Sequence, residues 1–149
     1  MPRFSLIVLV FILRYQITTA QTGYKETDTV KYTRNVVITN SINFKTVAYY
    51  QANSIRKIIR EFIGNGFSSS TIYYIQNDLL LESVYVSLRQ GNEYFEEHTY
   101  FLSNKMTKWE NSTDKIVDST LVVYSDKEKL VLKFFEDDLK EAKSKKRTK

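Results

Sequence analysis

Apolar and polar side chains alternate along much of this chain, and a period of two is typical of strands that have one drier face. Val84, Val86 and Leu88, for example, stand between polar or aromatic neighbours. Similar runs rich in Val, Ile, Thr, Tyr and Phe predict about seven strands, at residues 30–39, 43–52, 71–76, 80–89, 93–103, 116–124 and 129–135. Polar pairs such as Asn77-Asp78 and Ser103-Asn104 separate these strands, as expected for a series of hairpins.

One segment departs from this alternation. Ile55, Ile58, Ile59, Phe62 and Ile63 fall at positions i, i+3, i+4, i+7 and i+8, which would place five apolar side chains on one stripe of a helix. The spacing therefore predicts one amphipathic helix here. Together with the strands, it predicts an α+β fold that is mainly β: an antiparallel curved sheet or partly closed barrel of about seven strands, with the helix packed on it.

The first 20 residues contain the three parts of a secretory signal peptide. Arg3 supplies a positive charge, residues 4–13 form an apolar run, and Thr18-Thr19-Ala20 offers small residues for cleavage. The run is about half as long as the roughly 20 residues that span a bilayer, and no later stretch is suited to spanning one. We therefore expect a signal peptide at 1–20, a single strand-rich globular domain at 21–139 and a basic flexible tail at 140–149.

The composition favours a folded, β-rich domain, because Tyr (11) and Phe (9) are abundant while Gly (4) and Pro (1) are scarce. Cysteine is absent, which excludes disulfides, thiolate metal sites and cysteine nucleophiles. Small secreted domains commonly contain disulfides. This domain must therefore rely on its core, or act in a reducing place such as the cytosol of another cell.

The net charge of +5 is unevenly distributed along the chain. Basic residues concentrate in the tail, so the body at 21–139 is slightly acidic and lacks the composition of a nucleic-acid-binding surface. The candidate partner-binding residues of the tail are Lys143, Lys145, Lys146, Arg147 and Lys149. Their charge suits an acidic partner or an import receptor, and the alternative is a solvated end that aids solubility.

Histidine and tryptophan occur once each, and each has two interpretations. His98 follows Glu96 and Glu97 and could be a base or part of a metal site, but such sites need three or more converging groups. The competing interpretation of His98 is an exposed strand residue. Trp109 could stack on a ligand, although a core anchor is favoured. We therefore predict no catalytic residue, no metal site and no cofactor.

Two further features are candidates for modification or binding. Asn111-Ser112-Thr113 matches the N-glycosylation pattern in a polar segment, which makes Asn111 a candidate glycosylation site. Tyrosines are numerous on the predicted strands, at Tyr49, Tyr50, Tyr73, Tyr74, Tyr85, Tyr94 and Tyr100. Alternation sends half of them to each side, where they fill a core or line a pocket for a hydrophobic ligand.

The C-terminal half resembles the FAINT domain, found in many copies among secreted proteins of Theileria parasites. The resemblance lies within residues 94–135 and rests on Trp109-Glu110, the run at 119–124, the charged turn at 126–129 and the run at 130–134. Members of that family usually show a Trp, a polar segment, a strand with paired valines, a Lys-rich turn and a closing strand. The resemblance implies a secreted parasite protein, of a kind that can be exported to a host cell, with no enzymatic activity.

These observations favour a secreted, non-enzymatic and effector-like interaction module, acting extracellularly or after export into a host cell. Its expected partner is a macromolecule, most simply a protein, bound through the sheet surface and the basic tail. The alternative is a lipocalin-like extracellular carrier, in which a tyrosine-rich barrel encloses a small hydrophobic ligand. A hydrolase built around His98 with Glu96 or Glu97 is the least favoured alternative.

Overall fold

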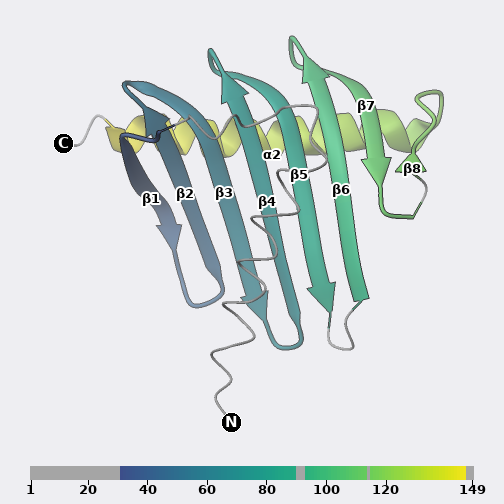
Figure 1. Ribbon diagram of the computed structural model, residues 1–149, viewed down its shortest axis with the longest axis horizontal. Helices are drawn as coiled ribbons and strands as arrows, with labels where there is room; N and C mark the ends of the chain where they lie inside the picture. The colour runs from purple at the N-terminus through teal and green to yellow at the C-terminus, as the bar shows by residue number, and fades with distance from the viewer. Residues whose placement is uncertain (1–30, 90–92, 114, 147–149) are drawn as a thin grey trace. The chain divides into compact units, whose positions relative to one another are not determined.

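The computed structural model describes residues 31–89, 93–113 and 115–146, with side chains through residue 145. Apart from Lys31, these residues belong to one compact unit that begins at Tyr32. It consists of a curved β-sheet and a long C-terminal helix (Figure 1). The signal peptide expected at 1–20 lies outside the described residues. Within them, no helix has the length and the apolar character needed to cross a membrane.

The sheet is a meander in which each strand pairs antiparallel with the next, so the spatial order is the chain order. The strands of the described part are β1 (Arg34–Asn40), β2 (Phe44–Gln51), β3 (Ser54–Gly64), β4 (Phe67–Gln76), β5 (Leu79–Arg89), β6 (Glu93–Leu102), β7 (Lys105–Asn111) and β8 (Lys115–Ile116). β1 and β8 lie at opposite edges, so the sheet is open. The predicted α+β, mainly β class with a curved antiparallel sheet is confirmed, and the sheet does not close into a barrel.

Two of the predicted turns have the backbone that a two-residue hairpin loop requires. Asn77 and Asp78 join β4 to β5 with φ of 53° and 64°, and Ser103 and Asn104 join β6 to β7 with φ of 52° and 60°. A positive φ at both central residues matches the right-handed twist of the paired strands, and Asn and Asp tolerate it better than most residues. These turns fix the register of β4 with β5 and of β6 with β7.

The predicted helix at residues 55–63 is wrong, because this segment is strand β3. A bulge explains the misleading spacing: Tyr49 pairs with Lys57 and Tyr50 pairs with Ile55, which leaves Arg56 as an extra residue. The bulge returns Ile55 to the face occupied by Ile58, and both are buried in the same core cluster. A strand with one bulge therefore reproduces the i, i+3 spacing of a helix.

The strands predicted at 116–124 and 129–135 are wrong beyond Ile116, because the chain forms helix α2 (Val122–Lys146) instead. The buried apolar residues of α2 are Tyr124, Val131, Phe135, Leu139 and Ala142, whose spacing follows one face of a helix. Burial of this stripe against the sheet outweighs the strand preference of the valines near the start of α2. The helix includes residues 122–134, where the FAINT resemblance implies the end of one strand, a Lys-rich turn and a closing strand.

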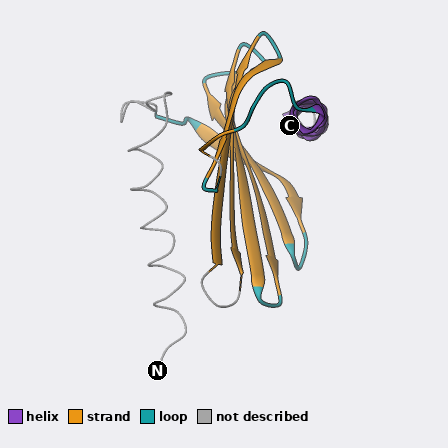
Figure 2. Ribbon diagram, turned by 90° about the vertical axis from the view of Figure 1, so that its right-hand side faces the viewer, coloured by secondary structure: helices purple, strands orange, loops and turns teal. Residues whose placement is uncertain are grey.

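Helix α2 packs on one face of the sheet, called here the helix-side face, and crosses the strands (Figure 2). The core between them contains aromatic and aliphatic residues from β1 to β7, including Tyr73, whose ring centroid lies 5.8 Å from that of Phe135. Polar contacts hold both ends of the helix. Glu128 accepts the main-chain N–H of Met106 at 2.7 Å, and the Lys145 ammonium donates to the Ile38 carbonyl.

Candidate ligand-binding site

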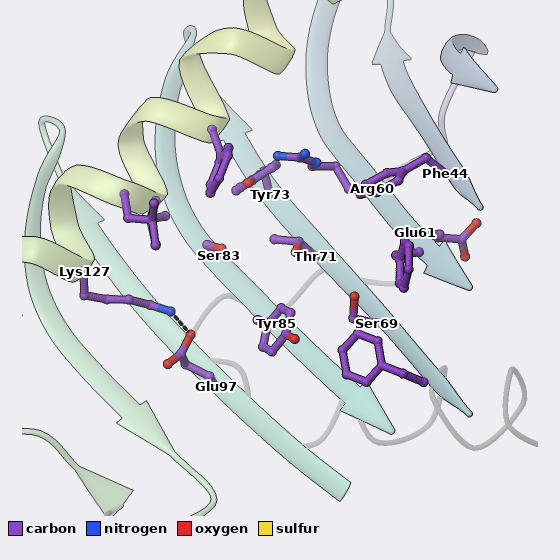
Figure 3. A pocket seen from close by; sticks show the side chains of 15 residues that line it. Phe44, Arg60, Glu61, Ser69, Thr71, Tyr73, Ser83, Tyr85, Glu97 and Lys127 are labelled. Carbon is purple, nitrogen blue, oxygen red and sulfur yellow. Dashed lines mark hydrogen bonds and ion pairs between the residues drawn. The ribbon is translucent and has the colours of Figure 1, made fainter. Parts of the chain in front are cut away.

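Helix α2 covers one end of the strands and leaves the other end of the helix-side face open (Figures 1 and 2). A hollow of about 490 Å³ lies between this open part of the sheet and the side of the helix. Figure 3 shows the residues that line it, which are Phe44, Arg60, Glu61, Phe62, Phe67, Ser69, Thr71, Tyr73, Ser83, Tyr85, Glu97, Lys127, Leu130, Val131 and Phe134. A hollow of this size accommodates a small organic molecule.

Aromatic rings form the apolar wall of the hollow. Phe44 and Phe62 are paired across β2 and β3 with ring centroids 5.1 Å apart, and Phe67 lies 5.9 Å from Phe62. From the helix, Leu130 and Phe134 remain 49% and 41% exposed. Large apolar side chains that line a hollow without being covered by their own chain are typical of a binding surface.

The floor of the hollow carries hydroxyl groups. Thr71 pairs in register with Tyr85, and Tyr73 pairs with Ser83, so strand alternation brings these side chains to the same face. The side-chain hydroxyls of Ser69, Thr71 and Ser83 have no hydrogen-bond partner among the described residues. They are therefore free to bind polar groups of a ligand, since hydroxyls both donate and accept.

Two ion pairs flank the hollow, one on each side of the hydroxyls. Arg60 lies 3.4 Å from the Asp138 carboxylate, measured from Nε to Oδ2, and its guanidinium lies 5.0 Å from the centre of the Phe134 ring. Burial raises the pKa of Asp138 to about 6, against the opposing effect of the Arg60 charge. On the other side, Lys127 donates to Glu97. The hollow thus combines an apolar wall with a polar, nearly charge-balanced floor.

A second hollow of about 460 Å³ adjoins the first and shares Phe67 and Tyr85 with it. Its other lining residues include Ser87, Arg89 and Phe95 from β5 and β6. The open part of the helix-side face is therefore continuous from β2 to β6. An elongated ligand would find apolar and polar contacts along this whole length.

His98 belongs to a different cluster, on the sheet face opposite α2. Its Nδ1 lies 2.9 Å from Glu82 Oε1 and its Nε2 lies 2.8 Å from Glu96 Oε1. Burial by itself lowers the pKa of His98, but the hydrogen bonds and charges of the two carboxylates outweigh it and raise the pKa to about 9. Tyr100 stacks on the imidazole with ring centroids 6.2 Å apart.

This environment assigns His98 a structural role. The competing interpretation of an exposed strand residue is wrong, because His98 is 8% exposed. An imidazolium whose two nitrogens both contact carboxylates has neither a free base nor a lone pair for a metal. Among the described residues, no group of three or more side chains is arranged to hold a metal ion.

The structure separates the tyrosines that the sequence grouped together. Tyr73 and Tyr85 line the hollow. Tyr50 lies in the core, where its hydroxyl donates to the Ala142 carbonyl at 3.2 Å. Trp109 is a buried core residue, as favoured from the sequence, and its Nε1 donates to Glu97 Oε2 at 2.9 Å.

Most of the expected basic tail is helical rather than flexible. Helix α2 continues to Lys146, so the predicted boundary at residue 140 falls inside it. Lys143 pairs with Asp78 at 2.7 Å, and Lys145 contacts the Ile38 carbonyl. These two side chains already have partners in the domain. Lys146 is the last helical residue, and Arg147 and Lys149 lie outside the described residues.

The sequence did not single out the phenylalanines that form the wall of the hollow. Phe44, Phe62 and Phe67 lie near the β1–β2 and β3–β4 turns, and Phe134 lies on the helix. Their signal in the sequence is weak, because a phenylalanine in a strand usually fills a core.

Comparison with known proteins finds no matching family model, no matching curated protein and no matching solved structure.

Proposed function

We propose that this protein is a non-catalytic binding protein whose hollow takes up a small amphiphilic ligand, in the manner of a carrier. The observation that carries the proposal is the hollow of about 490 Å³ with a phenylalanine wall and hydroxyls that lack hydrogen-bond partners in the described part of the chain. The apolar part of the ligand would contact the wall, and its polar part would contact the floor. Specificity in such sites comes from a few placed polar groups within a largely apolar surface.

The proposal keeps the ligand class of the lipocalin-like alternative but changes where the ligand lies. The sheet is open, so the ligand would lie between the sheet and α2 rather than inside a barrel. A macromolecular partner for the basic tail receives less support, because Lys143 and Lys145 have partners within the domain. Secretion and the FAINT resemblance remain predictions from the sequence.

The test uses 11-(dansylamino)undecanoic acid, an amphiphile with a fluorescent group, titrated into the purified protein. Trp109 is the single tryptophan and packs against Lys127, which lines the hollow, so energy transfer from Trp109 reports binding. We expect saturable binding in the wild type. We expect Thr71→Phe, which fills the hollow from its floor, to abolish binding, and Phe134→Ala to weaken binding by about tenfold through the lost apolar contact.

Val123→Ala is the matched control, because Val123 is also an exposed apolar residue of α2, at 50% exposure, but does not line the hollow. It should bind the probe like the wild type. Thermal unfolding of each variant separates loss of the site from loss of the fold. The proposal is wrong if the folded Thr71→Phe variant binds the probe as tightly as the wild type, or if the wild type does not bind it.

A further inference from the structure

Apolar side chains extend from the hollow to the end of the sheet and into solvent. We define the lip as five residues at the β1–β2 and β3–β4 turns: Ile42, Phe44, Phe62, Ile63 and Phe67. Ile42 is 100% exposed and Ile63 is 65% exposed, so neither contributes much to the core. The main-chain N–H of Ile63 donates to the Asn43 carbonyl at 3.0 Å, which places the two turns side by side (Figure 1).

The lip is continuous with the hollow, because its three phenylalanines also line that hollow. The paired rings of Phe44 and Phe62 lead from the two turns into the hollow, whereas Ile63 follows Phe62 and therefore points to the other face of the sheet. An apolar chain entering from this end would therefore remain in contact with apolar surface. Exposed apolar patches that continue into a binding hollow mark an interaction site rather than a folding contact.

The charges near the lip are balanced. Lys45 follows Phe44 and pairs in register with Glu61, and Arg89 pairs with Glu93 next to Phe67 in the sheet. The lip thus lacks the excess of basic residues that attracts proteins to anionic membranes. The exposed apolar residues and balanced charges of the lip fit a partner that has an apolar interior beneath a polar surface without net charge.

We propose that the lip docks into the headgroup region of a neutral phospholipid bilayer, with Ile42 and Ile63 inserted between the lipids. Exposed apolar side chains partition into the boundary between headgroups and acyl chains. The inference rests on the proposed function, since a lip at the open end gives the hollow a direct route for an amphiphile leaving the bilayer. Because the attraction is apolar, binding should be insensitive to salt.

The experiment is flotation of the full chain with phosphatidylcholine vesicles, compared with vesicles in which phosphatidylserine replaces part of that lipid. We expect equal binding to both and no loss at about 1 M salt. The double variant Ile42→Ser/Ile63→Ser should lower the partition coefficient by about tenfold. Leu102→Ser is the matched control, because Leu102 is 70% exposed at the β6–β7 turn, at the opposite end of the strands (Figure 1).

Three results would overturn the inference. The wild type would fail to float, the double variant would float as well as the wild type, or the Leu102→Ser control would lose as much binding as the double variant. A dimer in solution that depends on the isoleucines, without flotation, would assign the lip to a second copy instead. The dansyl probe, measured without vesicles, separates the two proposals. If the probe binds but the vesicles do not, the lip inference fails and the proposed function stands; if the vesicles bind but the probe does not, the proposed function fails.

Discussion

At the scale of single residues, His98 shows how a strand position acquires a fixed charge. Glu82 is 1% exposed, and its carboxylate is held by the imidazolium of His98. Glu96 contacts the other ring nitrogen, and the hydrogen bond from His98 lowers the pKa of this carboxyl. Removing the imidazole would leave Glu82 buried without a cation, which is costly. His98 therefore holds β5 and β6 together.

The raised pKa of His98 predicts how stability depends on pH. The folded pKa is about 9 and the unfolded value is 6.5, so the contribution is complete below pH 6.5 and is lost as the pH rises through 9. We expect the free energy of unfolding to fall by about 3 kcal/mol over this interval. Urea unfolding at several pH values measures it. In His98→Gln this fall should be absent, and an identical pH profile in both proteins would contradict the prediction.

At the scale of elements, α2 presents two neighbouring phenylalanines to different surroundings. Phe135 is 1% exposed and packs on Tyr73, whereas Phe134 is 41% exposed at the hollow. A helix turns by about 100° per residue, so adjacent residues face different directions. One side of α2 therefore stabilises the fold, while the adjoining side contributes to the candidate site.

This difference predicts that truncating Phe135 to alanine destabilises the fold far more than the same truncation of Phe134. Phe135→Ala should lower the free energy of unfolding by about 3–5 kcal/mol, because it leaves a cavity in the core. Phe134→Ala should change it by less than about 1 kcal/mol, because the ring is already partly in water. Chemical denaturation of both variants, followed by circular dichroism, measures the two values. Equal losses would show that Phe134 belongs to the core and not to an open site.

At the scale of the whole described unit, the long helix joins strands that are far apart in the sheet. Near its start Glu128 is bound to Met106 and Lys105 of β7, and near its end Lys145 contacts Ile38 of β1. An open meander on its own has two free edges and one uncovered face. A helix that contacts strands near both edges holds the curvature, which in turn forms the hollow.

The N-terminal segment and Asn111 lead to a prediction about processing. Secreted from a eukaryotic cell, the chain should begin at Gln21, because Thr18-Thr19-Ala20 suits signal peptidase. Asn111 lies at the end of β7 and its Oδ1 accepts the Thr113 main-chain N–H at 2.9 Å. Intact mass shows whether the chain begins at Gln21. A change in mass on treatment with a glycosidase, absent in Asn111→Gln, shows whether Asn111 is glycosylated. A secreted chain that retains Met1 would contradict the signal peptide.

The local features of the fold could be predicted from the amino-acid sequence. Alternation predicted the strands near β1, β2, β4, β5 and β6, and polar pairs predicted the turns at Asn77-Asp78 and Ser103-Asn104. These features depend on neighbouring residues, because side-chain direction and φ are set within a few positions of the chain. The same reasoning predicted the mainly β class, which the structure confirms.

Which segment is the helix, and where a ligand could lie, depends on packing between segments that are far apart in the chain. A bulge at Arg56 gives β3 a helical spacing, and the helical stripe of α2, from Tyr124 to Ala142, follows directly on Val122-Val123, which favour a strand. Long-range burial settles such cases, since local preferences differ by less than the free energy of packing a face. The hollow arises for the same reason: Phe44 and Phe134 are far apart in sequence and line one hollow only because α2 folds back across the sheet.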